Sequence, residues 1–232
     1  MGSILMHLCI SEKIKDKYNF GDQFMIGCVL PDILKRTTTS RDDSHYIMRF
    51  VEDGYVYRLP DLNKYIEEHK DIIKTDELTI GYFAHLVEDY VWFKYISGLF
   101  TKVREDEEEK DLIRFRSDNF SIPHPGEEYG IEMYQDYHNM NPWLYQKLKI
   151  DIDDFIKKVV EYTKDENAAN ILKEAMDLDI VCRNGKNEYL DENCIERYMK
   201  ASEELFELNW NRINSDTDIA SILGFSESCW KY

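Results

Sequence analysis

The sequence predicts an all-α protein, a single domain of several helices with one small β-hairpin. Long segments repeat apolar residues at helical spacing, and residues 76–100 form the longest of them without a proline. Only one short region has two β-prone runs around a turn. The 232 residues are 43% hydrophobic, enough to bury a sizeable core. Aromatic residues continue past the proline-rich stretch 120–130, so we expect one domain over residues 1–232.

The first sixty residues predict two helices and the hairpin. Ser3 is placed to cap a helix that ends near residue 18. A buried helix from residue 22 is expected to end near Pro31, which leaves Asp32 directly beyond an apolar run. A polar loop over residues 35–44 leads to His45. Two β-prone runs then flank Glu52, Asp53 and Gly54 and predict the hairpin.

The rest of the chain predicts further helices separated by polar segments. Asp61 or Pro60 is expected to open a helix over residues 61–70, and Asp76 and Asp191 are placed to cap helices over residues 76–100 and 190–213. Residues 104–111 are expected to form an acidic turn or helix start, and residues 120–130 a loop. A helix is expected at 127–149, with a break near Pro142. One or two amphipathic helices at 153–176 and a short connection at 181–190 are expected to follow. Residues 215–232 do not favour one structure.

The charge of the chain excludes several classes of partner. The formal net charge is -17 and the isoelectric point is near 4.8. Binding to a nucleic-acid backbone needs lysine and arginine to neutralise phosphates, so no nucleic-acid partner is expected. The same charge disfavours anionic membrane surfaces. No apolar run approaches 18 residues, so we expect no integral membrane association.

The cysteines and the amino-terminal residues predict a cytoplasmic location. The five cysteines are odd in number and form no Cys-x-x-Cys pair, which is typical of reduced thiols and does not indicate a zinc-thiolate site. Residues 1–10 are apolar but lack a basic start and a small-residue cleavage site, so we expect no secretion signal. The oligomeric state cannot be predicted from the composition.

The helix over residues 76–100 carries an unusual pair on its apolar face. His85 and Asp89 lie four residues apart within a stripe that is otherwise apolar. A buried ionised carboxylate is costly unless it is paired, hydrogen-bonded or bound to a metal. Two readings remain open: a core histidine hydrogen-bonded to a carboxylate, or two ligands of one metal ion.

Further imidazole and carboxylate groups occur at apolar or junction positions in the first 89 residues. His7 lies in the apolar first helix, and Asp32 and His45 flank one loop. Asp32, His45, His85 and Asp89 together make a set of two nitrogen and two oxygen ligands. Such a set suits Zn²⁺, or Mn²⁺ or Fe²⁺ in a more open geometry.

The order of these residues along the chain resembles the zinc-dependent phospholipase C family. The segments that carry the resemblance are ILMHL, LPDIL, SHY and GYFAHLVEDYVWF, and they cover about the first hundred residues. The resemblance implies a helical domain of the phospholipase C/P1 nuclease type, in which Asp32, His45, His85 and Asp89 bind metal. His7 would belong to a neighbouring metal position bridged by Asp89, so one or two ions are expected. The family's further ligands have no clean match, and His124 and His138 are weaker candidates.

These observations predict a metal-dependent hydrolase of phosphate esters, with phosphodiesters favoured over monoesters. The substrate would be a small phosphate ester or a phospholipid. Asp32, in preference to Glu88, is the candidate catalytic base that accepts the proton of the attacking water. The alternative is a helical interaction protein without catalysis, whose metal site is structural or vestigial. A nucleotide phosphohydrolase with adjacent His and Asp ranks lower, because the chain contains no His-Asp dipeptide.

Overall fold

The computed structural model describes residues 3–97, 101–105, 112–115, 123–176, 187 and 189–215. Most of them are helical, as the sequence predicts. The helices are α1 (Ile4–Tyr18), α2 (Asp22–Thr37), α3 (Arg41–Ser44), α4 (Leu62–His69), α5 (Glu77–Val91), a π-helical turn η1 (Trp92–Ile96), α7 (Gly126–Lys147), α8 (Ile152–Thr163), α9 (Asn167–Ala175) and α10 (Glu192–Asn214). The strands are β1 (Ile47–Glu52), β2 (Tyr55–Pro60), β3 (Thr101–Arg104), β4 (Leu112–Phe115) and β5 (Pro123–Pro125).

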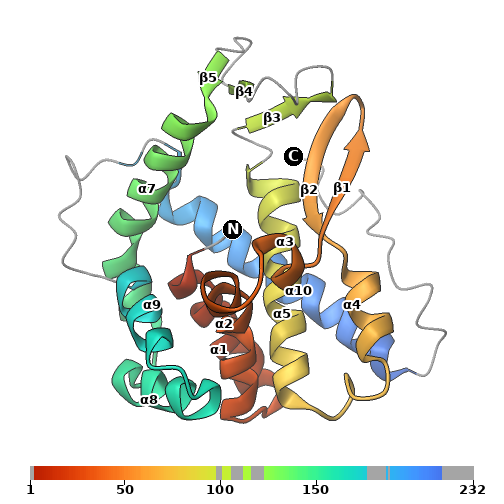
Figure 1. Ribbon diagram of the computed structural model, residues 1–232, viewed down its shortest axis with the longest axis vertical. Helices are drawn as coiled ribbons and strands as arrows, with labels where there is room; N and C mark the ends of the chain where they lie inside the picture. Colours follow the sequence, from red (N-terminus) through yellow and green to blue (C-terminus); the bar gives the residue numbers. More distant parts are fainter. Residues whose placement is uncertain are drawn as a thin grey trace.

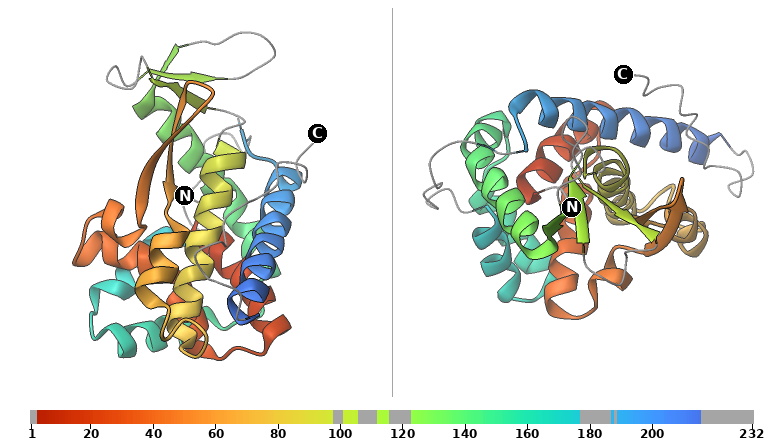
Figure 2. Two further views of the ribbon diagram at one scale, coloured as in Figure 1. Left: turned by 90° about the vertical axis from the view of Figure 1, so that its right-hand side faces the viewer. Right: turned by 90° about the horizontal axis from the view of Figure 1, so that it is seen from above.

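Helix α5 occupies the middle of the fold and packs most extensively against α2. It also contacts α1, α4 and α10, whereas α7, α8 and α9 lie on the far side of α1 and α2 (Figure 1). The hairpin formed by β1 and β2 stands beside the carboxyl end of α5, as two further views of the molecule show (Figure 2). The elements from the first ninety residues therefore surround α5.

The predicted hairpin is confirmed, but the sheet is larger than expected. Asp53 and Gly54 form the turn with φ angles of 53° and 76°. Strands β3, β4 and β5 extend the hairpin in the order β1-β2-β3-β4-β5, all antiparallel. The prediction of a loop at 120–130 is wrong, because β5 pairs with β4 and α7 begins at Gly126. A proline-containing strand is tolerated at the edge of a sheet.

Two prolines that were expected to end or break helices lie inside them instead. Helix α2 continues through Pro31 to Thr37, and α7 continues through Pro142 to Lys147. An interior proline costs about 3 kcal/mol in an isolated helix. In α2 this cost is offset by packing, because no other pair of described elements packs as extensively as α2 and α5. The continuation places Asp32 within a helix rather than at its end.

Two glycines allow α2 and α5 to approach at backbone distance. A Cβ atom added to Gly27 would lie 2.2 Å from the carbonyl oxygen of Leu78, and one added to Gly81 would lie 2.0 Å from that of Phe24. Neither position has room for a side chain, since carbon and oxygen atoms do not approach so closely. The residues that follow on both helices are thereby brought within reach of each other.

The predicted helix caps are confirmed. The side chains of Ser3, Asp61, Asp76 and Asp191 each accept a hydrogen bond from a backbone amide in the first turn of their helices. The predicted helix over 76–100 is regular only to Val91 and then widens into η1, and residues 98–100 lie outside the described part.

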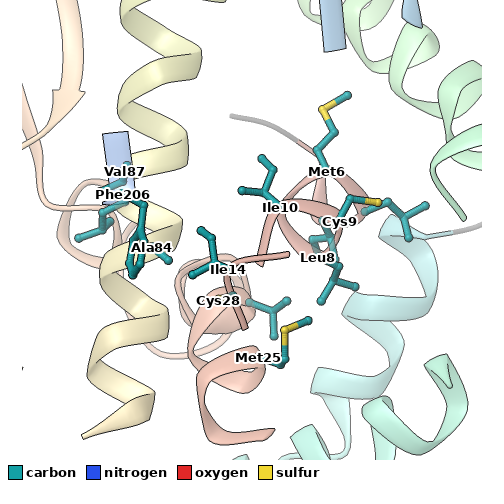
Figure 3. Close-up of a cluster of buried hydrophobic side chains, with 14 of the residues drawn as sticks. Met6, Leu8, Cys9, Ile10, Ile14, Met25, Cys28, Ala84, Val87 and Phe206 are labelled. Carbon is teal, nitrogen blue, oxygen red and sulfur yellow. The ribbon is translucent and has the colours of Figure 1, made fainter. Parts of the chain in front are cut away.

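The core is built mainly from α1, α2, α5 and α10, and α4, α7, α8 and α9 add further buried side chains to it. Figure 3 shows part of it, where Met6, Ile10 and Ile14 of α1 lie near Met25 and Cys28 of α2. Ala84 and Val87 of α5 and Phe206 of α10 complete this part of the cluster (Figure 3). None of the described helices combines the length and the apolar character that crossing a bilayer requires.

Candidate metal centre

Five side chains from four segments converge inside this core. His7 comes from α1, Asp32 from α2, His45 from the residue after α3, and His85 and Asp89 from α5. The three histidines and Asp89 are 0% exposed and Asp32 is 4% exposed. The structure therefore brings together the five residues that the sequence favours most as metal ligands.

Asp89 lies between the three imidazole rings. Its Oδ1 is 3.6 Å from Nε2 of His7. Its Oδ2 is 3.7 Å from Nε2 of His45 and 3.8 Å from Nε2 of His85. One carboxylate thus faces the same ring nitrogen of all three histidines, with its two oxygens directed to different partners.

Asp32 and the stacked rings close the cluster. Asp32 Oδ1 lies 3.3 Å from Nε2 of His45, and the same carboxylate pairs with Lys35 one helical turn later. The rings of His7 and His85 stack with their centroids 4.0 Å apart. Two groups of three have ligand atoms within 4.8 Å of one another: His7, Asp32 and His85, and His45, His85 and Asp89. His85 belongs to both, so the groups share one centre.

The outer nitrogen of each imidazole is held by a protein acceptor. Nδ1 of His85 lies 2.7 Å from the carbonyl oxygen of Cys28, which can only accept, so this Nδ1 carries the proton. Nδ1 of His7 lies 2.5 Å from Oε2 of Glu88. Nδ1 of His45 lies 2.8 Å from Oγ of Ser44, whose own hydroxyl donates to the Arg41 carbonyl. In the neutral form with the proton on Nδ1, which the Cys28 carbonyl fixes for His85, each ring would present the lone pair of its Nε2 to the centre.

Five of the atoms that face the centre have no hydrogen-bond partner among the described residues. These are Nε2 of His7, His45 and His85 and both carboxylate oxygens of Asp89. Buried polar atoms are nearly always hydrogen-bonded, and an unpaired buried group costs about 1–3 kcal/mol. Five such atoms directed at one point therefore require an explanation that hydrogen bonding among the described residues does not provide.

The ionisation states of His85, Asp32 and Asp89 suit a set of ligands, whereas the hydrogen bond to Glu88 raises the pKa of His7 despite its burial, so a metal ion would have to displace a proton there. Burial lowers the pKa of His85 to about 3, so its imidazole is neutral near pH 7. Burial opposes ionisation of Asp32, but its neighbours His45 and Lys35 outweigh burial and hold its pKa well below the usual value. Burial raises the pKa of Glu88 to about 7 despite its contact with His7. Neutral imidazoles and ionised carboxylates are the forms that bind metal ions.

Sequence reasoning missed several of the supporting groups. Glu88 was considered only as a proton acceptor, whereas it holds the outer nitrogen of His7 and accepts a hydrogen bond from Ser11 at 3.2 Å. In the sequence, the position of Glu88 beside Asp89 on a buried helix could have indicated that it supports the centre. Ser44 and the Cys28 carbonyl have no comparable signal, because a single hydroxyl or backbone carbonyl does not stand out in a sequence.

The two weaker candidates do not join the cluster. His138 lies on α7 and belongs to neither of the two groups of described residues that could hold a metal ion. His124 lies in β5, and its side chain lies outside the described residues. The centre as described thus contains three imidazole and two carboxylate side chains.

Comparison with known proteins identifies no protein that is related to this chain. No family model matches the chain, and no curated protein or solved structure is significantly similar to it.

Proposed function

We propose that this protein is a metal-dependent hydrolase of phosphate esters. The observation that carries the proposal is the set of five buried, unpartnered atoms on His7, His45, His85 and Asp89. A divalent cation would satisfy all of them at once, and hydrogen bonds to Glu88, Ser44 and the Cys28 carbonyl would hold the rings in the tautomer that a metal requires.

The spacing of the donors supports a cation at this position. Zinc binds nitrogen and oxygen ligands at about 2.1 Å, so two ligand atoms on one tetrahedral ion lie about 3.4 Å apart. The distances from Asp89 to the three Nε2 atoms and from Asp32 to Nε2 of His45 range from 3.3 to 3.8 Å, and the ligand atoms within each group of three lie within 4.8 Å of one another. The protein thus holds these atoms at nearly the separation that a bound ion would impose.

The donor set supports zinc but also admits Mn²⁺ or Fe²⁺. Three imidazoles and two carboxylates form a mixed nitrogen and oxygen set, and soft thiolate ligands are absent among the residues that make up the centre. Asp89 directs one oxygen to His7 and the other to His45 and His85, an arrangement that suits a carboxylate bridging two ions. One or two ions are therefore proposed.

A divalent ion at this centre would polarise a phosphoryl oxygen and lower the pKa of a bound water molecule. Asp32 would accept the proton from that water, because its carboxylate is ionised and its Oδ1 lies 3.3 Å from Nε2 of His45, a proposed metal ligand. Asp32 is also the one member of the five with measurable exposure, so it marks the side on which a substrate would enter. A small phosphodiester is the proposed substrate class.

The alternative is a helical protein without catalysis whose metal is structural. Near-complete burial of all five side chains favours this reading, because structural sites are closed by protein ligands and catalytic sites keep a position for water. Activity measurements distinguish the two, since both predict bound metal and only the first predicts turnover.

Elemental analysis tests the metal site first. Protein purified without a chelator should contain close to one or two equivalents of zinc or another divalent metal, and His85→Ala should lose most of it. His69→Ala is the matched control, because His69 lies on α4 outside the cluster and bonds the Tyr65 carbonyl. Equal metal content in wild type and His85→Ala would contradict the site.

Hydrolysis of bis-para-nitrophenyl phosphate tests the enzyme. The loaded wild type should hydrolyse it, and Asp89→Asn should remove the activity. A loaded wild type without activity on this ester or on phospholipid vesicles would favour the structural alternative.

A further inference from the structure

A serine on α1 shares one carboxylate with His7. The hydroxyl of Ser11 donates a hydrogen bond to Oε1 of Glu88 at 3.2 Å, and Nδ1 of His7 lies 2.5 Å from Oε2 of the same carboxylate. His7 and Ser11 are four residues apart on α1, so their side chains lie on the same face of that helix. Each oxygen of Glu88, on α5, is thus contacted by one residue of α1.

The surroundings of Ser11 show that its hydroxyl needs this contact. Ser11 is 0% exposed and lies among the buried apolar residues of α1, which include Leu8, Ile10 and Ile14. Serine is a weaker helix former than leucine, and a buried hydroxyl costs free energy unless it is hydrogen-bonded. An apolar residue at this position would pack without that cost. The choice of serine is therefore explained by its bond to Glu88.

Glu88 does not depend on Ser11 for a partner, because His7 already contacts Oε2. The last torsion of a glutamate side chain has only broad preferences, so a carboxylate held at one oxygen can still turn. A second donor at Oε1 fixes the plane of the carboxylate and the direction in which Oε2 faces His7. That direction orients the imidazole ring, whose Nε2 lies 3.6 Å from Oδ1 of Asp89.

Resting on the metal site proposed above, we propose that Ser11 is a positioning residue that strengthens metal binding through Glu88 and His7. The effect passes from the Ser11 hydroxyl to the Glu88 carboxylate, and from there to the ring that would bind the ion. Replacing a group that orients a metal ligand lowers metal affinity about ten- to hundredfold. Ser11 is one contact further from the ligand than Glu88, so we expect the lower end of that range.

A double-mutant cycle in the full-length protein tests this role. Zinc affinity is measured by competition with a fluorescent zinc chelator for the wild type, Ser11→Ala, Glu88→Met and the double variant. Ser11→Ala should bind zinc about tenfold more weakly than the wild type. Glu88→Met removes both hydrogen bonds at similar side-chain volume. Adding Ser11→Ala to it should change zinc affinity less than about twofold, because the path from Ser11 to His7 is already broken.

Ser202→Ala is the matched control. Ser202 is also 0% exposed but lies on α10, and the described hydrogen bonds to Glu88 come from His7 and Ser11. This variant should bind zinc as the wild type does.

Two results would overturn the inference. Unchanged zinc affinity in Ser11→Ala would mean that Ser11 contributes only to the fold, even if thermal unfolding of the zinc-free variant showed lower stability. A tenfold loss that persists in the Glu88→Met background would mean that Ser11 acts by another route. A wild type that binds no zinc instead contradicts the proposed metal site, and the first measurement of the series reveals that case.

Discussion

Nδ1 of His7 lies 2.5 Å from Oε2 of Glu88, and both side chains are completely buried. The contact joins α1 to α5 across 81 residues of sequence. It fixes the orientation of the His7 ring, so that Nε2 faces Asp89. A carboxylate that accepts a hydrogen bond from a metal-binding histidine also makes that histidine a stronger ligand.

Glu88→Gln should therefore weaken zinc binding about ten- to hundredfold, the range found when such outer partners are replaced. Glutamine keeps the size of the side chain but removes its charge, so the fold should be retained. Competition with a fluorescent zinc chelator measures the affinity, and circular dichroism checks the fold. Zinc affinity equal to that of the wild type would mean that Glu88 does not support His7.

Removal of the metal should lower the stability of the wild type. Without an ion, the five atoms facing the centre remain buried and unpaired. At a free zinc concentration of one hundred times the dissociation constant, binding stabilises the folded state by about 2.7 kcal/mol. Thermal unfolding with and without zinc should show this difference in the wild type. Asp89→Asn should show little difference, because it removes the carboxylate that faces all three rings.

Gly81→Ala should destabilise the protein by at least about 1–3 kcal/mol, the usual cost of a substitution that overpacks a core. The added methyl group would meet the Phe24 carbonyl at 2.0 Å, so α2 and α5 must separate. That movement carries Asp32 away from His85, and zinc affinity should fall as well. Gly21→Ala is the control, because its Cβ would meet only the flexible Glu77 carboxylate. Urea unfolding measures both variants, and equal stability would refute the close contact.

The residues of the candidate centre could be predicted because they break a local pattern. His7, His85 and Asp89 are polar groups on apolar helix faces, and Asp32 follows an apolar run. Burial makes such groups costly, so their placement carries information. The helix caps were predictable for a similar reason, since each depends on one side chain and the three residues after it.

The parts that could not be predicted depend on contacts between distant segments. From the neighbouring residues alone, Pro31 predicts the end of a helix, but packing of α2 on α5 keeps the helix intact. As a result, the pairing of Lys35 with Asp32 on one helical face was not foreseen. Strands β3, β4 and β5 were missed because β-strands are stabilised by their partners, and these short segments have weak patterns of their own.

A buried glutamate on α1 provides the last prediction. Glu12 is 6% exposed, and its carboxylate accepts hydrogen bonds from the backbone amides of Lys149 at 3.0 Å and Ile150 at 2.9 Å. These amides lie between α7 and α8, so the contact ties both helices to α1. Glu12→Ala would remove the charged acceptor of these two part-buried hydrogen bonds, and we expect a loss of about 1–3 kcal/mol in urea unfolding.

Zinc content should stay unchanged in Glu12→Ala, because Glu12 contacts the segment between α7 and α8 and does not support any of the imidazole rings. Glu203→Ala is the comparison, since it removes a partly exposed ion pair with Lys13, the residue next to Glu12. Partly exposed pairs contribute about 0–1 kcal/mol, so that variant should be nearly as stable as the wild type. Equal losses in the two variants would mean that the amides of Lys149 and Ile150 find other acceptors, and that α1 does not hold α7 and α8 through this carboxylate.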